Sequence, residues 1–131
     1  MQFQSYGCRR INLRPEDPKE TRMVRSIIRM LIPLEKQSEA LEIIGSMIEQ
    51  TRFEPGCLSC RLYRGGEDAR AIMFEELWLS EEDVQRHLRS EKYRKILLVV
   101  EMAEETPEIR FDTIAHSTGM ESIEQVRTHT R

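Results

Sequence analysis

A carboxylate, an indole and an imidazole lie close together in the sequence between residues 74 and 87. In a strand, alternate side chains share a face, so Phe74, Glu76 and Trp78 are expected to point the same way. Glu76 would then interrupt an otherwise apolar stripe, where a carboxylate seldom lies without a partner. This pattern indicates a site and not only a packed core.

His87 is the residue that could complete this site. Ser80 and Asp83 match a capping box, which starts a helix directly after the strand. The apolar side of that helix would turn His87 back toward Glu76. An imidazole has an ordinary pKa of about 6.5, which suits it to take a proton from a phenolic hydroxyl. We therefore predict His87 as a catalytic base and Glu76 as the catalytic group that orients it.

Each of these residues also has a purely structural explanation. A histidine on a helix flank is often a packed, hydrogen-bonded side chain, and Glu76 could be one half of a buried ion pair. Trp78 and Phe74 are most simply core aromatics, but a flat ring that lines a cavity can also hold a planar ligand. We predict Trp78, Phe74 and Tyr93 as substrate-binding residues.

The composition is that of a single folded domain. The chain has 131 residues, a length that allows a buried core without disulfides or metals. Its formal net charge is -3, and 33% of its residues are charged. Lys and Arg are scattered among Asp and Glu, so nucleic acid is not an expected partner. No apolar run approaches the ~20 residues of a membrane helix, and residues 1–22 lack the apolar region of a secretory signal. A cytoplasmic location is the expectation.

The sequence contains three cysteines, Cys8, Cys57 and Cys60. Strand alternation would place Cys57 and Cys60 on opposite faces, and no second pair of ligands accompanies them. A thioredoxin-type pair would begin a helix, and a zinc site would need further His or Cys. A Gly-rich phosphate loop is also missing from the sequence. We predict packing cysteines, no metal and no cofactor.

Hydrophobic periodicity divides the chain into alternating strands and helices. In chain order it predicts a strand over 23–32, a helix over 35–52, two strands over 57–64 and 71–79 joined as a hairpin, a helical region over 81–104 broken or bent near Ser90, and a strand over 108–115. Residues 1–22 have the composition of a flexible N-terminal arm, and 116–131 form a C-terminal extension with a short helix over 120–127. The order within 23–115 is the α+β, ferredoxin-like βαββαβ arrangement, a four-stranded antiparallel sheet with helices on one face.

The other face of that sheet remains to be covered. It would mix apolar with charged side chains: Ile27, Leu31, Met73, Leu77 and Ile114 with Arg25, Arg29, Arg61, Glu75 and Asp112. Such a face is too apolar to suit water and too charged for a dry core. A second copy of the same face would match it, so we predict a homodimer joined through the sheet.

Four short segments together suggest a family. They are Glu54-Pro55-Gly56-Cys57-Leu58, Arg61-Leu62-Tyr63, Phe74-Glu75-Glu76-Leu77-Trp78 and His87-Leu88-Arg89-Ser90-Glu91. In this order and spacing they resemble the antibiotic biosynthesis monooxygenase (ABM) domain family over about residues 23–115. The resemblance implies a dimeric α+β barrel with a small-molecule pocket between the sheet and the helices of each subunit. It also implies oxidation of a quinol or polyphenolic aromatic by O2 without metal or flavin.

Two alternatives remain open. Some ABM relatives bind and degrade haem through a histidine further along the second helical region, but residues 93–98 here are Tyr-Arg-Lys-Ile-Leu-Leu. Because kinship of fold does not fix chemistry, the main alternative is a non-catalytic ligand-binding or sensing dimer that uses the same pocket. A dry pocket with a His–Glu contact would favour the enzyme. A pocket filled by Trp78 and Met side chains would favour the structural module.

Overall fold

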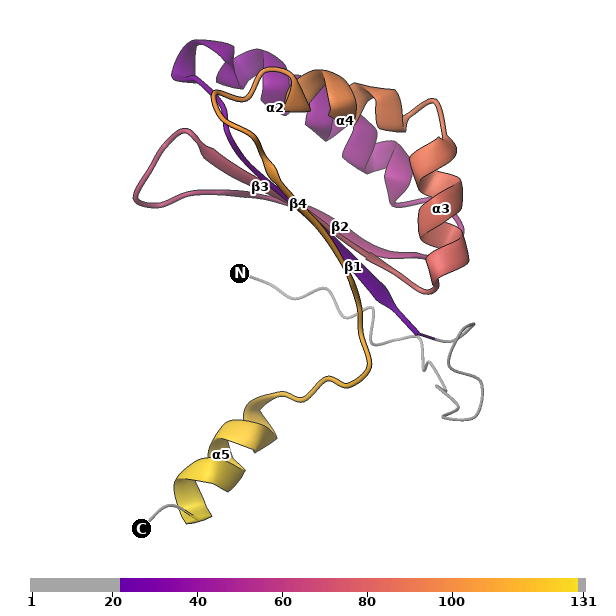
Figure 1. The fold of residues 1–131 in the computed structure, drawn as a ribbon, viewed down its shortest axis with the longest axis vertical. Coiled ribbons are helices and arrows are strands. Elements are labelled where there is room, and N and C mark those ends of the chain that lie inside the picture. The colour runs from indigo at the N-terminus through magenta and orange to yellow at the C-terminus, as the bar shows by residue number, and fades with distance from the viewer. Residues whose placement is uncertain (1–21, 130–131) are drawn as a thin grey trace.

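The computed structural model describes residues 22–129, which form one antiparallel sheet with helices on one face (Figure 1). The elements are β1 (Val24–Leu31), α2 (Leu34–Thr51), β2 (Cys57–Arg64), β3 (Ala71–Trp78), α3 (Glu81–Arg89), α4 (Tyr93–Val100), β4 (Glu108–Thr113) and α5 (Met120–His129). The four strands lie in the order β2-β3-β1-β4, and every neighbouring pair is antiparallel. The predicted α+β, ferredoxin-like fold is therefore confirmed.

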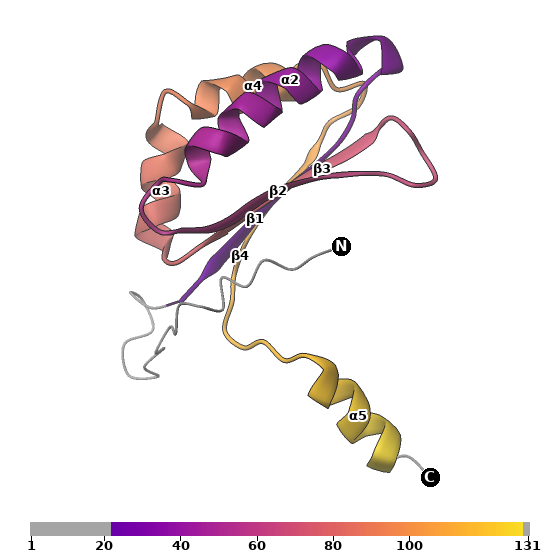
Figure 2. The ribbon, with the colours of Figure 1, turned by 180° about the vertical axis from the view of Figure 1, so that it is seen from behind.

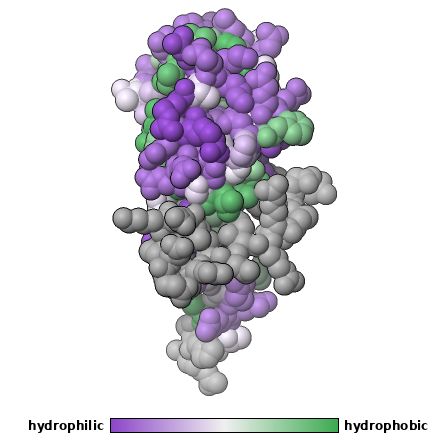
Figure 3. Space-filling view, turned by 90° about the vertical axis from the view of Figure 1, so that its right-hand side faces the viewer, coloured by the Kyte–Doolittle hydropathy of each residue, from purple (hydrophilic) through white to green (hydrophobic). Residues whose placement is uncertain are grey.

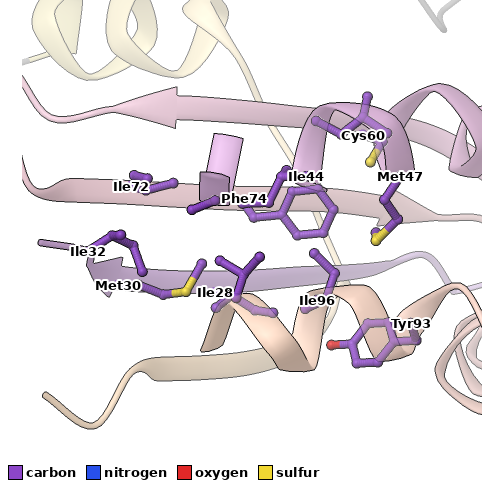
Figure 4. Packing of buried hydrophobic residues seen from close by; sticks show 13 residues of the cluster. Ile28, Met30, Ile32, Ile44, Met47, Cys60, Ile72, Phe74, Tyr93 and Ile96 are labelled. Atoms are coloured by element: carbon purple, nitrogen blue, oxygen red, sulfur yellow. The ribbon is translucent and has the colours of Figure 1, made fainter. Parts of the chain in front are cut away.

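The helices α2, α3 and α4 cover the inner face of the sheet, as we call it below (Figures 1 and 2). Buried residues of α2 recur at helical spacing: Ala40, Ile44, Met47 and Ile48. They pack with inner-face residues of the strands, such as Ile28 and Phe74, in the main core shown in Figure 4. The two periodicities read from the sequence, that of a helix and that of a strand, thus meet in one apolar layer.

Helix α3 starts at the predicted capping box. The Ser80 hydroxyl oxygen accepts the Asp83 backbone N–H at 3.2 Å and donates to the Asp83 carboxylate at 2.9 Å. Of the two predicted alternatives for the helical region near Ser90, a bend or a break, the structure shows a break. Ser90 is extended, with ψ 156°, and α4 begins after it.

Strand β2 contains a β-bulge between Cys57 and Ser59. Cys57 pairs with Trp78 and Cys60 pairs with Glu76, so both cysteines lie on the inner face. The prediction of opposite faces is wrong, because the bulge adds one residue to the alternation. Burial raises the pKa of Cys57 to about 12 and also raises the pKa of Cys60. Both free thiols therefore stay protonated and are poor nucleophiles or metal ligands.

The edge strand β4 and the segment after it are the least covered part of the fold. Ile109 and Phe111 are 46% and 44% exposed. The chain then forms α5, which lies apart from the helical layer (Figures 1 and 2). This confirms the predicted helix near 120–127. The predicted arm over residues 1–22 lies, except for residue 22, outside the described residues, as do residues 130–131 of the C-terminal extension.

The surface next to α3 is mostly hydrophilic, with a small hydrophobic area in the middle (Figure 3). Helix α3 has acidic residues in its first turn and basic residues in its last, an arrangement that complements the helix dipole. Within residues 22–129, no helix has both the length and the apolar character needed to cross a membrane.

The loop between α2 and β2 is fixed against α3 at Gly56. The φ of Gly56 is 82°, in the left-handed region, and a Cβ at this position would lie 2.2 Å from Cγ of Asp83. Arg86 donates to the Pro55 carbonyl at 3.0 Å and also to Asp83. These contacts fix the position of Glu54, the residue before Pro55, relative to α3.

We expect Gly56→Ala to lower the free energy of unfolding by about 2–4 kcal/mol, because the new methyl group combines an unfavourable φ with a clash. Gly66→Ala is the matched control, since a Cβ there would meet no atom within 4 Å. Urea denaturation followed by Trp78 fluorescence gives both values. Equal effects of the two substitutions would contradict this account of the loop.

Candidate functional site

Glu76, His87 and Trp78 meet under the helices, at the end of β3. Nε2 of His87 lies 2.9 Å from Oε2 of Glu76, and the Trp78 indole N–H donates to Oε1 of Glu76 at 3.2 Å. The rings of Trp78 and His87 are tilted by 35°, with centroids 4.6 Å apart. The predicted contact between Glu76 and His87 is thus confirmed, with Trp78 beside both.

Glu54 is a further member of this cluster. Both of its carboxylate oxygens lie 3.0 Å from Nδ1 of His87, and Nζ of Lys92 lies 3.0 Å from its Oε2. In the sequence, Glu54 stands out only as part of a family segment and has no predicted role. Its position just before the Pro55-Gly56 turn was the available signal. Periodicity cannot reveal a contact between residues 33 positions apart.

The cluster is removed from solvent. His87 and Trp78 are 0% exposed and Glu76 is 1% exposed. Burial by itself lowers the pKa of His87, but hydrogen bonds to Glu76 and Glu54 and the charges of both carboxylates together raise this pKa above its ordinary value. The imidazolium form, which donates from both ring nitrogens, is therefore favoured.

The other two predicted substrate-binding residues, Tyr93 and Phe74, both belong to the main core. The Tyr93 ring meets His87 edge-on, with centroids 5.2 Å apart and an interplanar angle of 84°. Burial, reinforced by the charge of Glu76, raises the pKa of Tyr93 to about 12, so its hydroxyl stays protonated. Phe74 belongs to the main core (Figure 4), whereas Trp78 packs in a second cluster with Val24 and Val84. Of these two core residues, Tyr93 also contacts the buried cluster, through the ring of His87.

A cavity of about 210 Å³ lies at the opposite end of the sheet. Leu31 and Ala71, which form the last pair of β1 with β3, line it together with Glu105 and Glu108. None of the predicted site residues lines this cavity. Because Glu76 is almost fully covered, a ligand can reach it only if neighbouring side chains move.

Within residues 22–129, no group of three or more His, Cys, Asp or Glu side chains is arranged to hold a metal ion.

The sequence profile described as antibiotic biosynthesis monooxygenase matches residues 23–97, more than half of the chain. The chain belongs to this family. The match spans Glu54, Glu76, Trp78, His87 and Tyr93, so the ABM unit contains the whole buried cluster. None of the curated proteins compared with the chain matches it.

Solved structures share the ABM fold. A conserved protein from Methanosarcina mazei Go1 has a TM-score of 0.66 and 26% identity, covering 71% of this chain and 93% of that one. Rv0793 from Mycobacterium tuberculosis has a TM-score of 0.67 and 21% identity, covering 74% and 99%. A structure named antibiotic biosynthesis monooxygenase has a TM-score of 0.65 and 21% identity, covering 71% and 99%. Nearly the whole of each neighbour therefore corresponds to part of this chain.

The raised pKa of His87 predicts that stability falls as pH rises. In the unfolded chain the imidazole titrates at about pH 6.5, so the contribution of His87 to the free energy of unfolding is complete below that pH. Above it the folded state binds more protons than the unfolded state, until the pH passes the raised pKa. The slope is at most about 1.4 kcal/mol per pH unit for one proton.

Urea denaturation between pH 6 and pH 9 measures this slope in the wild type and in His87→Gln, which should lose it. His116→Gln, at an exposed position after β4, is the control and should keep it. If His87→Gln misfolds, NMR titration of the His87 ring replaces the comparison. A ring that loses its proton below about pH 6.5 would contradict the assignment.

Proposed function

We propose that this protein is a cytoplasmic monooxygenase that oxidises a small quinol or polyphenolic aromatic with O2 and without a cofactor. The observation that most supports this is the buried Glu76–His87 contact beside Trp78 in a chain of the ABM family. A base, a dry pocket and correct positioning are what such chemistry requires from a protein. The substrate class itself comes from the family resemblance.

The hydrogen bonds of the cluster indicate which of Glu76 and His87 accepts the proton and which one positions the other. Both ring nitrogens of His87 face carboxylates, so the ring has no lone pair directed at a ligand. Glu76 accepts hydrogen bonds from Trp78 and His87, and a carboxylate has about four lone-pair positions in all. Glu76 can therefore take the phenolic proton directly. His87 then acts through Glu76, holding the carboxylate in place with its charge and its Nε2–H.

The reaction balances without another redox partner. The phenolic O–H bond breaks and its proton moves to Glu76, which leaves an electron-rich phenolate. The phenolate gives one electron to O2, and the resulting radical and superoxide join at a ring carbon that carries hydrogen. The O–O bond of this peroxide and the C–H bond of the same carbon then break, the carbon becomes a quinone carbonyl, and the departing oxygen leaves as water with the ring proton and a second proton. Phenol and O2 thus give quinone and water, and Glu76 returns its proton to the departing oxygen.

A non-catalytic binding or sensing module is the second candidate. The observation in its favour is that the cluster is closed and His87 is fully engaged by two carboxylates. A buried ion pair of this kind can be retained for structure alone.

Oxygen consumption separates the two candidates. With a panel of hydroquinones, naphthols and polycyclic phenols, we expect O2 uptake by the purified protein above the buffer rate for at least one compound. Metal analysis and an absorption spectrum should show no stoichiometric metal, flavin or haem. Binding without uptake for every panel member would favour the binding module, and a stoichiometric cofactor would refute the cofactor-free mechanism.

Glu76→Gln should lower kcat by about 10²–10⁴-fold, because the amide cannot accept the proton. Trp78→Phe should mainly raise KM. Glu82→Gln, on the exposed side of α3, is the control and should retain wild-type rates. Melting temperatures show whether each variant is folded. A Glu76→Gln protein that is folded and fully active would remove Glu76 from the mechanism.

The proposed enzyme is a homodimer that packs through the uncovered sheet face. Half-buried Met73 and Leu77 lie on that face, among charges that are already paired within one subunit. Arg25 lies 3.4 Å from Glu75, and Arg29 lies 3.1 Å from Glu108. Paired charges beside apolar side chains can be buried against a second copy at lower cost than unpaired ones.

Leu77→Glu should convert the dimer to a monomer, since it places an unpaired charge in the centre of the interface. Leu98→Glu, at a position 53% exposed on α4, should leave the dimer intact. Sedimentation velocity at micromolar concentration measures both variants beside the wild type. A monomeric wild type would end the dimer proposal.

A further inference from the structure

The hydroxyl of Ser26 is buried and has no partner. The side chain is 1% exposed, and its Oγ makes no hydrogen bond within the described structure. Buried polar atoms in folded proteins are nearly always paired, so an exception calls for an explanation. A serine hydroxyl can both donate and accept, which suits it to a ligand oxygen.

The sheet register places this hydroxyl next to the proposed proton acceptor. Ser26 on β1 is directly opposite Glu76 on β3 and, on its other side, Phe111 on β4. Directly opposite residues of antiparallel strands share a face, with Cβ atoms about 4.5–5.5 Å apart. Ser26 therefore lies between a carboxylate and an aromatic ring on the inner face.

The β4 side offers a route to these two residues. Phe111 and Ile109 share the inner face, and both remain substantially exposed because β4 is the edge strand. A ligand that enters from this edge would pass Phe111 first, then reach Ser26 and, one strand further, Glu76. A planar ring could lie on this apolar strip with a hydroxyl directed toward β1 and β3.

We propose that Ser26 is a catalytic residue that donates a hydrogen bond to the phenolate oxygen formed when Glu76 takes the proton. Before transfer, the ligand hydroxyl donates to Glu76 and accepts from Ser26. As the O–H bond breaks, negative charge grows on the oxygen that Ser26 contacts, and a donor fixed in a dry site stabilises it. The inference rests on the proposed function for its substrate class and requires a free phenolic hydroxyl.

A binding experiment tests this role without turnover. The probe is 4-nitrophenol, whose phenolate absorbs visible light, titrated against the full-length protein under anaerobic conditions. Ser26→Ala should bind the phenolate at least about tenfold more weakly and raise the pKa of the bound phenol by about 1. Ser59→Ala is the matched control, because Ser59 pairs with Leu77 and faces away from the site. The methyl ether 4-nitroanisole should bind Ser26→Ala and wild type alike.

The binding test requires that Ser26→Ala folds. Removal of an unpaired buried hydroxyl should leave stability equal to or above that of the wild type, so a folded Ser26→Ala is expected. Ser26→Cys preserves the size with a weaker donor and should give intermediate phenolate affinity. Equal 4-nitrophenol binding and pKa in wild type and Ser26→Ala would overturn the inference, as would a wild type that does not bind 4-nitrophenol.

Oxygen uptake shows which of the two proposals fails. If no phenol is oxidised but Ser26→Ala still loses phenolate affinity, the Ser26 site stands and the monooxygenase proposal falls. If phenols are oxidised and Ser26→Ala matches the wild type in binding and in kcat, the function stands and the role of Ser26 is refuted. If both proposals hold, kcat of Ser26→Ala should fall by about 10–100-fold.

Discussion

The fold is organised around one imidazole ring held between two carboxylates. His87 comes from α3, Glu76 from β3 and Glu54 from the loop after α2, so a single ring joins three elements far apart in the chain. Its Nδ1 faces Glu54 and its Nε2 faces Glu76, and the ring is completely buried. Loss of either carboxylate would leave the other charges poorly compensated in a dry interior, which is why this interaction constrains everything around it.

The same arrangement limits the chemistry available to the site. Both ring nitrogens of His87 already face carboxylates, so in the proposed mechanism the proton acceptor is Glu76. Lys92 and Glu54 connect the buried charges to the surface, and Trp78 holds the remaining carboxylate oxygen. Packing that preserves the charged cluster also closes it, and only β1 separates Glu76 from the exposed edge strand β4.

Most of the fold could be predicted from the sequence, because its signals are local. The alternation along β3, the helical spacing in α2 and the capping box at Ser80 each depend on residues a few positions apart, and the structure agrees with all three. The bulge in β2 could not be foreseen. A single inserted residue changes the face of Cys57 without altering the composition of the strand, and only pairing with β3 reveals it.

The sequence by itself determined that Glu76, Trp78 and His87 would share a face and meet, since a strand period and a helix start fix their directions. Only the tertiary structure decided the partners that arrive from elsewhere. Glu54 reaches His87 because the Gly56 turn docks on Asp83, and Ser26 lies beside Glu76 because β1 is inserted between β3 and β4. These two placements depend on how distant segments connect and on the strand register, which the packing of the whole sheet sets. Neither leaves a periodic pattern in the sequence around Glu54 or Ser26.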